Sequence, residues 1–145
     1  MKMTNGEYAK YVKDMTPKSK TGPDMLRAFL IGGLICAIGQ GILNGYTALG
    51  ADQETAATAT SVTLVFLGAL LTGLGVYDDI AKLAGAGTLV PITGFANSVV
   101  SPALEFKSEG YITGTAAKMF VIAGPVIVFG TTASVLYGII YCLFK

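Results

Sequence analysis

Residues 83–104, LAGAGTLVPITGFANSVVSPAL, decide how the rest of the chain is interpreted. These 22 residues carry no charge, and a helix of this length is long enough to cross a bilayer. Glycine is conformationally permissive, and proline removes a backbone donor and clashes with the preceding turn, so both tend to break or kink a helix. The helix-breaking candidates are Gly85, Gly87, Pro91, Gly94 and Pro102. Irregular backbone survives at membrane depth only where protein buries it or water lines it. The stretch therefore predicts either a broken, re-entrant segment that lines a permeation path or a kinked structural helix.

Composition supports a membrane environment for the whole chain. The 145 residues are 52% hydrophobic and 13% charged, with a mean hydropathy of +0.62. Soluble proteins are roughly 25% charged. A net charge of +1 gives no reason to expect a nucleic-acid partner, and the absence of histidine excludes imidazole catalysis. We expect an all-α integral membrane protein that is not an enzyme, has no cofactor and has no metal site.

Three further stretches are firm candidates for transmembrane helices. They cover about residues 25–49, 55–77 and 119–144, and long uncharged runs form most of each. Residues 1–24 form a polar segment in which Glu7–Met15 has the spacing of a short amphipathic helix, with a solvated tail as the alternative. Residues 105–118 are expected to be a polar connector, and residues 25–145 a single membrane domain.

Small residues recur every four positions in the first and last spans, where they let another helix approach closely. The helix-packing candidates are Gly33, Ala37, Gly41, Gly45, Gly130, Ser134 and Gly138. Gln40 and Asn44 share one face of the first span, and their amides predict contact with protein or water. Cys36 and Cys142 lie in apolar runs and are expected to be buried as small hydrophobes.

Orientation follows from the basic residues, which accumulate in cytoplasmic segments. The N-terminal part carries six of them, including Lys2 and Lys18 and counting Arg27 at the start of the first span, and none lies in the connection after that span. The N-terminal segment is therefore expected to be cytoplasmic. If residues 83–104 re-enter, Lys107 and Lys118 are cytoplasmic and Lys145 lies outside. If the segment crosses the bilayer, these sides reverse, and the charge counts lean weakly toward re-entrance.

Polar residues of the broken segment are the candidates to line a path. They are Thr93, Asn97, Ser98 and Ser101, to which Gln40 and Asn44 of the first span are added. No charged side chain lies deep in any span, which favours passive or gated conduction over pumping. Helix ends at membrane depth present free N–H groups that suit carboxylates, so an organic anion fits such a path.

Three quoted stretches resemble the SpoVA family of sporulation membrane proteins. They are FLIGGLICAIGQ at 29–40, the run from 70 to 110 that contains GAGTLVPITGFANS, and IAGPVIVFG at 122–130. The resemblance implies a location in the inner membrane of the forespore and spore. It further implies a complex with AD-type and AEb-type subunits that moves dipicolinic acid, with calcium, during sporulation and germination, plausibly under tension. The alternative function is a non-conducting scaffold subunit in a membrane complex, and either function predicts an oligomer or hetero-oligomer.

Overall fold

The computed structural model describes residues 4–16 and 20–144, and every regular element among them is helical. Three helices in this part of the chain are long and apolar enough to span a membrane: Thr21–Ala48, Gln53–Gly73 and Tyr111–Phe144. The predicted all-α membrane fold with three firm spans is confirmed. Lys2, Lys18 and Lys145, which entered the orientation argument, lie outside the described residues.

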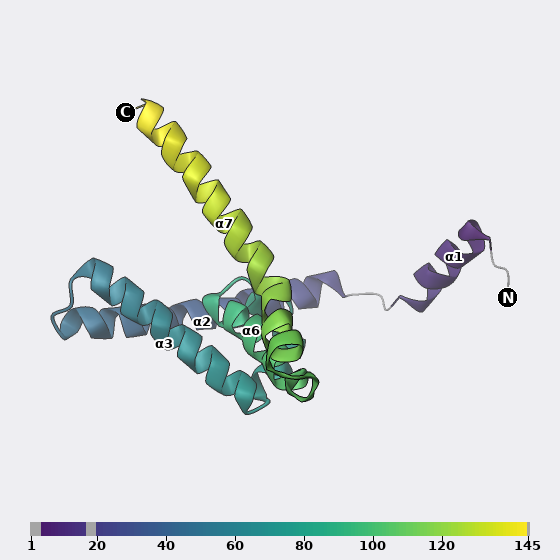
Figure 1. Cartoon of the computed structure of the whole chain (residues 1–145). Helices are drawn as coiled ribbons and strands as arrows, with labels where there is room; N and C mark the ends of the chain where they lie inside the picture. The colour runs from purple at the N-terminus through teal and green to yellow at the C-terminus, as the bar shows by residue number, and fades with distance from the viewer. Residues whose placement is uncertain (1–3, 17–19, 145) are drawn as a thin grey trace.

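The N-terminal helix α1 (Asn5–Met15) stands apart from the rest of the protein (Figure 1). Thr4 is its N-cap, and its hydroxyl accepts a hydrogen bond from the Glu7 N–H while the Glu7 carboxylate accepts one from the Thr4 N–H. This reciprocal arrangement satisfies two free donors and fixes where the helix starts. The predicted short helix is confirmed, and its placement on the membrane surface stays a prediction.

Helices α2 (Thr21–Ala48) and α3 (Gln53–Gly73) form an antiparallel pair joined by a short turn. Asp52 caps α3 by accepting a hydrogen bond from the Thr55 N–H at 3.2 Å. The Tyr46 and Thr63 hydroxyls, 2.8 Å apart, link the two helices near this turn. Helix α2 begins four residues before the predicted Met25, because Pro23 is tolerated in the first turn of a helix, where its missing N–H costs nothing.

Helix α3 ends at Gly73, four residues before the predicted end of this span at Tyr77. Gly75 has φ +73°, a left-handed conformation that glycine adopts without steric cost, and a new helix, α4 (Val76–Ala84), begins directly after it. Tyr77 therefore belongs to the broken segment and not to the second span.

The broken segment consists of α4, the single turn α5 (Ala86–Leu89) and α6 (Ile92–Glu105). Helix boundaries fall at Gly85, with φ +53°, and at Pro91, which is the N-cap of α6. The expectation that Gly87, Gly94 and Pro102 also interrupt the helix was wrong. Gly87 lies within α5 and Gly94 within α6, both where another backbone comes close. Helix α6 continues through Pro102, which lies in its last turn, so few residues follow the missing hydrogen bond.

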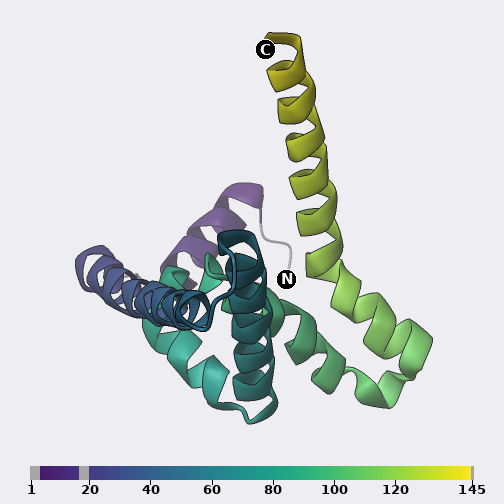
Figure 2. The same cartoon turned by 90° about the vertical axis from the view of Figure 1, so that its left-hand side faces the viewer.

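Contacts between α3 and α6 favour the re-entrant alternative for this segment. Gly68 lies against Thr93, and Thr72 lies against Asn97, so both helices run in the same direction (Figures 1 and 2). Helix α6 is about 21 Å long at 1.5 Å per residue, which is shorter than a hydrocarbon core of about 30 Å. The segment therefore goes deeper along α5, turns at Pro91–Ile92 beside Ile35 and Gly39 of α2, and returns through α6 to the side on which α3 ended. We call α4–α6 the hairpin.

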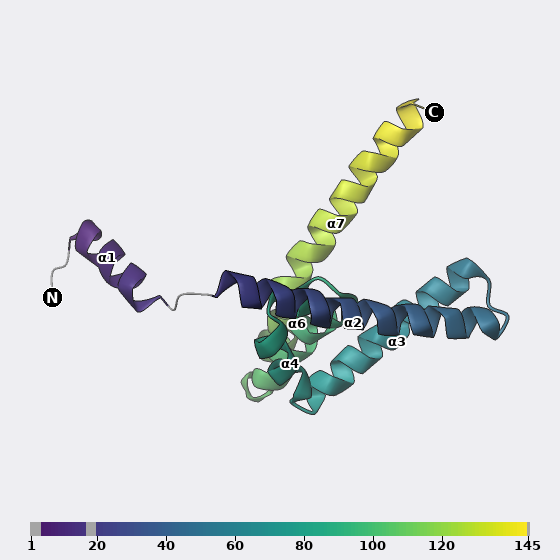
Figure 3. The same ribbon diagram turned by 180° about the vertical axis from the view of Figure 1, so that it is seen from behind.

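The tip of the hairpin rests on α2. Helix α2 lies at the back in Figure 1 and at the front in Figure 3. A Cβ added to Gly32 would lie 3.1 Å from the Gly87 carbonyl oxygen, and one added to Gly87 would lie 2.9 Å from the Ala28 Cα. These contacts lie about 10 to 16 Å along α2 from its first residue, at 1.5 Å per residue. The hairpin thus enters the membrane partway.

The last helix, α7 (Ala117–Phe144), projects away from the other helices and ends far from them (Figure 1). It follows a short 3₁₀ turn, η1 (Lys107–Glu109), and a π-helical turn, η2 (Tyr111–Ala116), that is continuous with it. Residues 111–118, predicted as a polar connector, are therefore helical, because the apolar and small residues YITGTAA extend the span. The combined helix changes direction partway (Figure 2), and Pro125 lies inside it.

The predicted small-residue faces are not used for packing within the chain. Gly33, Ala37, Gly41 and Gly45 are exposed, and so are Gly130, Ser134 and Gly138. The α2 face that packs instead carries Gly32 and Gly39, and a Cβ on Gly39 would lie 3.3 Å from Leu64 Cδ1. The two faces start at adjacent residues, so spacing alone does not separate them. Contact of the exposed faces with other chains stays a prediction.

Both cysteines also differ from expectation. Cys36 and Cys142 are exposed on the surfaces of α2 and α7, and were predicted to be buried. Both lie on spanning helices whose other surfaces are largely apolar and exposed as well. In a membrane these surfaces face lipid or another chain, so an apolar setting does not require burial within the monomer.

Candidate functional site

A small cavity lies within the hairpin, between α4, α6 and the start of α7. Its volume is about 270 Å³. We call it the hairpin cavity. Three predicted path residues line it together, Asn97, Ser98 and Ser101, and the remaining lining residues are Tyr77, Ala81, Thr88, Leu89, Gly94, Pro102 and Ile122. All of these residues are uncharged, so the cavity offers hydroxyl and amide groups without a fixed charge.

Tyr77 is the centre of the hydrogen bonding at one end of this cavity. It is 3% exposed, and its hydroxyl oxygen lies 3.2 Å from the Thr88 carbonyl oxygen and 3.0 Å from the Thr93 hydroxyl oxygen. A phenol has one proton. The Tyr77 hydroxyl is the donor toward both oxygens, so its single proton goes to the Thr88 carbonyl or to the Thr93 hydroxyl at any one time. This chain of bonds connects α4, α5 and α6 in the low-dielectric interior, where such bonds are strong.

Asn97 anchors α6 to α3. Its side-chain amide lies 2.9 Å from the Thr72 hydroxyl oxygen, while the Thr72 hydroxyl also lies 2.7 Å from the Gly68 carbonyl oxygen. The Asn97 side-chain oxygen accepts this hydrogen bond, so the single Thr72 proton is shared between that oxygen and the Gly68 carbonyl. Asn97 and Thr93 thus hold the hairpin in place, which is a role distinct from lining a path.

The two serines face the cavity on the other side of α6. The Ser98 hydroxyl donates to the Phe95 carbonyl at 2.8 Å, which leaves its oxygen lone pairs available as acceptors. Ser101 lies one turn further along the same helix, and both serines are half-buried. Of the predicted path residues on α6, these two serines are therefore the ones whose hydroxyls do not hold α6 to another helix.

The structure separates Gln40 and Asn44 from the other path candidates. Both are exposed on α2, where the Gln40 amide donates to the Asn44 side-chain oxygen at 2.9 Å. Gln40 borders a different, largely apolar cavity of about 360 Å³ between α2, α3 and the Pro91–Ile92 turn. The six residues predicted to line a path therefore fall into two groups on different faces.

Glycines let the backbones around the cavity come close together. A Cβ on Gly68 would lie 3.0 Å from the Thr93 carbonyl oxygen, and one on Gly94 would collide with the Thr88 carbonyl oxygen. The Thr88 carbonyl therefore receives the Tyr77 hydroxyl at the point where α5 and α6 meet. Close backbone approach through small residues is the usual means of packing helices in membranes.

Sequence reasoning missed Tyr77 and Thr72 as parts of this site. Both were assigned to the second span, where a tyrosine next to charged residues is typical of an interface anchor. The signal for Tyr77 is Gly75, which lies between α3 and α4 and turns Tyr77 back into the protein. Thr72 does lie in α3, and no sequence signal marks its contact with Asn97. In the described residues, no group of three acidic or cysteine side chains is placed to hold a metal ion.

Charged residues near the hairpin lie on its outer surface. Lys82 forms an ion pair with Asp79 at 2.9 Å, and this neighbouring carboxylate raises the pKa of Lys82. The Lys118 ammonium group lies 4.4 Å from the centre of the Phe106 ring, where η1 meets the start of α7.

The same segments carry the match to known proteins. The family model described as SpoVAC/SpoVAEB sporulation membrane protein matches residues 24–140, which include the entire hairpin. The chain belongs to this SpoVAC/SpoVAEB family. It is also 49% identical over 146 residues to Stage V sporulation protein AC of Bacillus subtilis (strain 168), covering 99% of this chain and 97% of that protein.

The resemblance seen in the sequence is thereby confirmed, and the protein is a sporulation membrane protein of the SpoVAC/SpoVAEB family. No solved structure matches the chain significantly. The family match covers α2 through most of α7 and leaves α1 outside it. The hairpin cavity is thus a structural feature of the part of the chain that defines family membership.

Proposed function

We propose that this protein is a channel or transport subunit that moves dipicolinic acid, with calcium, across the inner membrane of the spore and is gated by membrane tension. It acts during sporulation and germination, in a complex with AD-type and AEb-type members of the SpoVA family. We expect no catalytic activity. The observation that carries the proposal is the re-entrant hairpin, whose cavity gathers Asn97, Ser98 and Ser101 without any charged residue.

The chemistry of the cavity supports an anionic cargo. The Asn97 amide and the Ser101 hydroxyl can donate hydrogen bonds to a carboxylate without the fixed charge that would trap a dianion, and Ser98 can do so when it releases the Phe95 carbonyl. Helix α6 adds its N-terminal end, which no side chain caps and which carries a partial positive charge. A rigid aromatic dicarboxylate can exchange its hydration for such donors one at a time.

The cavity of one chain does not span the bilayer, so a complete path requires several chains. Helix α7 and the outer face of α2 are exposed in the monomer and provide surfaces for this assembly. The same exposed surfaces favour the second candidate function, a scaffold that holds partner subunits while another subunit conducts.

Flux through sealed liposomes tests the proposal. The purified protein is reconstituted with dipicolinate inside, and release is followed with and without an osmotic downshift. We expect tension-dependent release that falls when Ser98 or Ser101 is replaced by alanine. Ser61→Ala on the exposed face of α3 is the matched control, because its hydroxyl donates within its own helix, to the Ala57 carbonyl at 3.1 Å.

Two other outcomes have clear meanings. Release only after an AEb-type partner is added indicates that subunits share the pore. No release under either condition, together with cysteines at positions 98 and 101 that do not react with a polar thiol reagent, supports the scaffold function. Cys36 and Cys142 must be replaced first, because both are exposed.

A further inference from the structure

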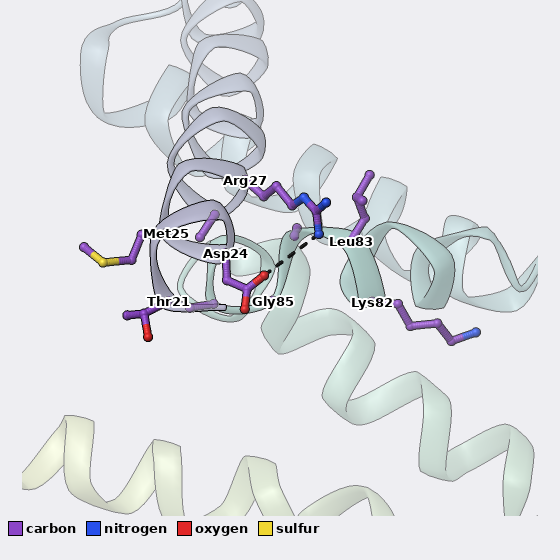
Figure 4. Close-up of a pocket in the computed structure, with 10 residues that line it drawn as sticks. Thr21, Asp24, Met25, Arg27, Lys82, Leu83 and Gly85 are labelled. Carbon is purple, nitrogen blue, oxygen red and sulfur yellow. Dashed lines mark ion pairs between the residues drawn. The ribbon is translucent and has the colours of Figure 1, made fainter. Parts of the chain in front are cut away.

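A larger cavity lies at the opposite end of α4 from the hairpin cavity, between the first turns of α2 and the turn that ends α4. Its volume is about 410 Å³. We call it the interfacial cavity. Thr21, Asp24 and Arg27 contribute from α2, and Lys82, Leu83 and Gly85 contribute from the hairpin (Figure 4).

The residues of this cavity place it at the membrane–water boundary. Arg27 is the last charged residue before the 24 uncharged residues 28–51. Lys82 is the last charged residue before the 22 uncharged residues 83–104. Basic residues at the ends of spanning segments lie at the level of lipid headgroups. The two cations therefore flank one cavity at the depth where phospholipid phosphates lie.

Both cations are available to a further anion. Arg27 pairs with Asp24 at 3.9 Å, and the side chains are 56% and 50% exposed. Lys82 pairs with Asp79 at 2.9 Å, and those side chains are still more exposed. Exposed ion pairs of this kind contribute little to stability, so a phosphate competes with them readily.

The chemistry of the two side chains suits a phosphate, although only Arg27 points between α2 and the hairpin (Figure 4). Figure 4 shows the Arg27 and Asp24 side chains on the side of α2 that faces the hairpin, whereas Lys82 extends outward from α4. The guanidinium group presents a planar fork that binds phosphate through two hydrogen bonds, and a lysine side chain is long and flexible. Arg27 and Lys82 together outnumber the single carboxylate, Asp24, in the lining.

Two large apolar side chains also line this cavity, Leu83 on the hairpin and Met25, which extends to the side of α2 away from the hairpin (Figure 4). Met25 and Leu83 are 68% and 56% exposed next to the cavity. A site with cations at headgroup depth and exposed apolar walls below them matches an amphiphile better than a free ion. Ala28, the residue after Arg27, also lines the cavity and lies against Gly87, so an occupant of this cavity touches both α2 and the hairpin.

We propose that the interfacial cavity binds the phosphate of a phospholipid headgroup. Arg27 and Lys82 are the phosphate ligands, and Met25 and Leu83 contact the first carbons of the acyl chains. This site couples the hairpin to the lipid layer, and its existence does not depend on whether the protein conducts.

Binding of phosphatidylglycerol to the full-length protein in detergent, counted by native mass spectrometry, tests the site. The Arg27→Gln/Lys82→Gln variant should lose about tenfold or more in affinity, since each charged hydrogen bond contributes about tenfold. The control variant Lys10→Gln/Lys107→Gln removes the same charge from exposed residues of α1 and η1 and should bind within about twofold of the parent. Equal losses in the two variants would show that only general charge attraction operates.

Competition separates the possible ligands. Diacylglycerol, which has no phosphate, should fail to displace phosphatidylglycerol, and so should inorganic phosphate at millimolar concentration. Displacement by diacylglycerol overturns the role of the phosphate, and displacement by inorganic phosphate overturns the assignment to a lipid.

A photoreactive phosphatidylglycerol supplies a test on the unmodified protein, in case the double variant does not fold. Crosslinked peptides should map to residues 21–28 and 82–86. Crosslinks confined to other segments would overturn the proposal.

Discussion

Glu7 shows how one side chain fixes the start of a helix and makes that helix sensitive to pH. Its carboxylate accepts hydrogen bonds from the Thr4 N–H and hydroxyl, each at 2.9 Å. The bonds from Thr4, that of its backbone first, hold the pKa of Glu7 below the ordinary 4.5. Because the pKa is lowered in the helix, this stabilisation is complete above 4.5 and is lost as the pH falls through the lowered value.

We therefore expect α1 to lose helicity as the pH falls below about 4.5. Backbone chemical shifts of residues 5–15 in the full chain, recorded in detergent, measure this change. Glu7→Gln keeps a capping acceptor but does not titrate, so this variant should stay equally helical across the same range. A transition of the same size in Glu7→Gln would assign the effect to another group.

Single glycines around the hairpin are expected to be far more sensitive than those on exposed faces. Gly94→Ala places a methyl group against the Thr88 carbonyl, and overpacking of this kind costs about 1 to 3 kcal/mol. Gly41→Ala is the control, because no atom lies within 4 Å of its added Cβ. It should be neutral or stabilise α2 by up to about 1 kcal/mol. Unfolding in SDS–detergent mixtures measures both free energies, and equal effects would contradict the packing described.

At the scale of the element, the hairpin depends on the chain of hydrogen bonds through Tyr77. Tyr77→Phe keeps the ring but leaves the buried Thr88 carbonyl without its side-chain donor, at a cost of about 1 to 2 kcal/mol. The control is Tyr111→Phe, whose side chain is 84% exposed. Unfolding free energies should fall for the first variant and stay constant for the second. A stable Tyr77→Phe protein would show that packing alone holds the hairpin.

The hairpin also shows how far the sequence can predict this fold. The uncharged stretch with Gly85 and Pro91 predicted an interrupted segment, because these two residues act through local backbone geometry. The roles of Tyr77 and Thr72 could not be predicted, since their partners Thr88, Thr93 and Asn97 become neighbours only after the segment folds back. Likewise, spacing predicted a small-residue face on α2 but did not reveal which of two adjacent faces meets the hairpin.

For the whole molecule, we expect three spanning helices and one re-entrant hairpin to place α1 and the end of α7 on opposite sides of the membrane. Cysteines introduced one at a time at Asn5, Ser108 and Leu143, after replacement of Cys36 and Cys142, test this arrangement. A membrane-impermeant thiol reagent should label positions 5 and 108 from the same side and position 143 from the other. Labelling of position 108 from the side opposite to position 5 would establish four spans.

The docking of the hairpin onto α2 and α3 has a consequence for biogenesis. The surfaces against which the hairpin packs, around Gly32 of α2 and Gly68 of α3, belong to helices that are synthesised earlier. A segment with an interrupted backbone is poorly suited to enter hydrocarbon alone, because its unpaired peptide groups need partners there. The α2–α3 pair must therefore leave the translocon and pair first, and the hairpin then inserts against it. Synthesis from the N-terminus supplies this order, and a circularly permuted chain that begins at α4 would lack it.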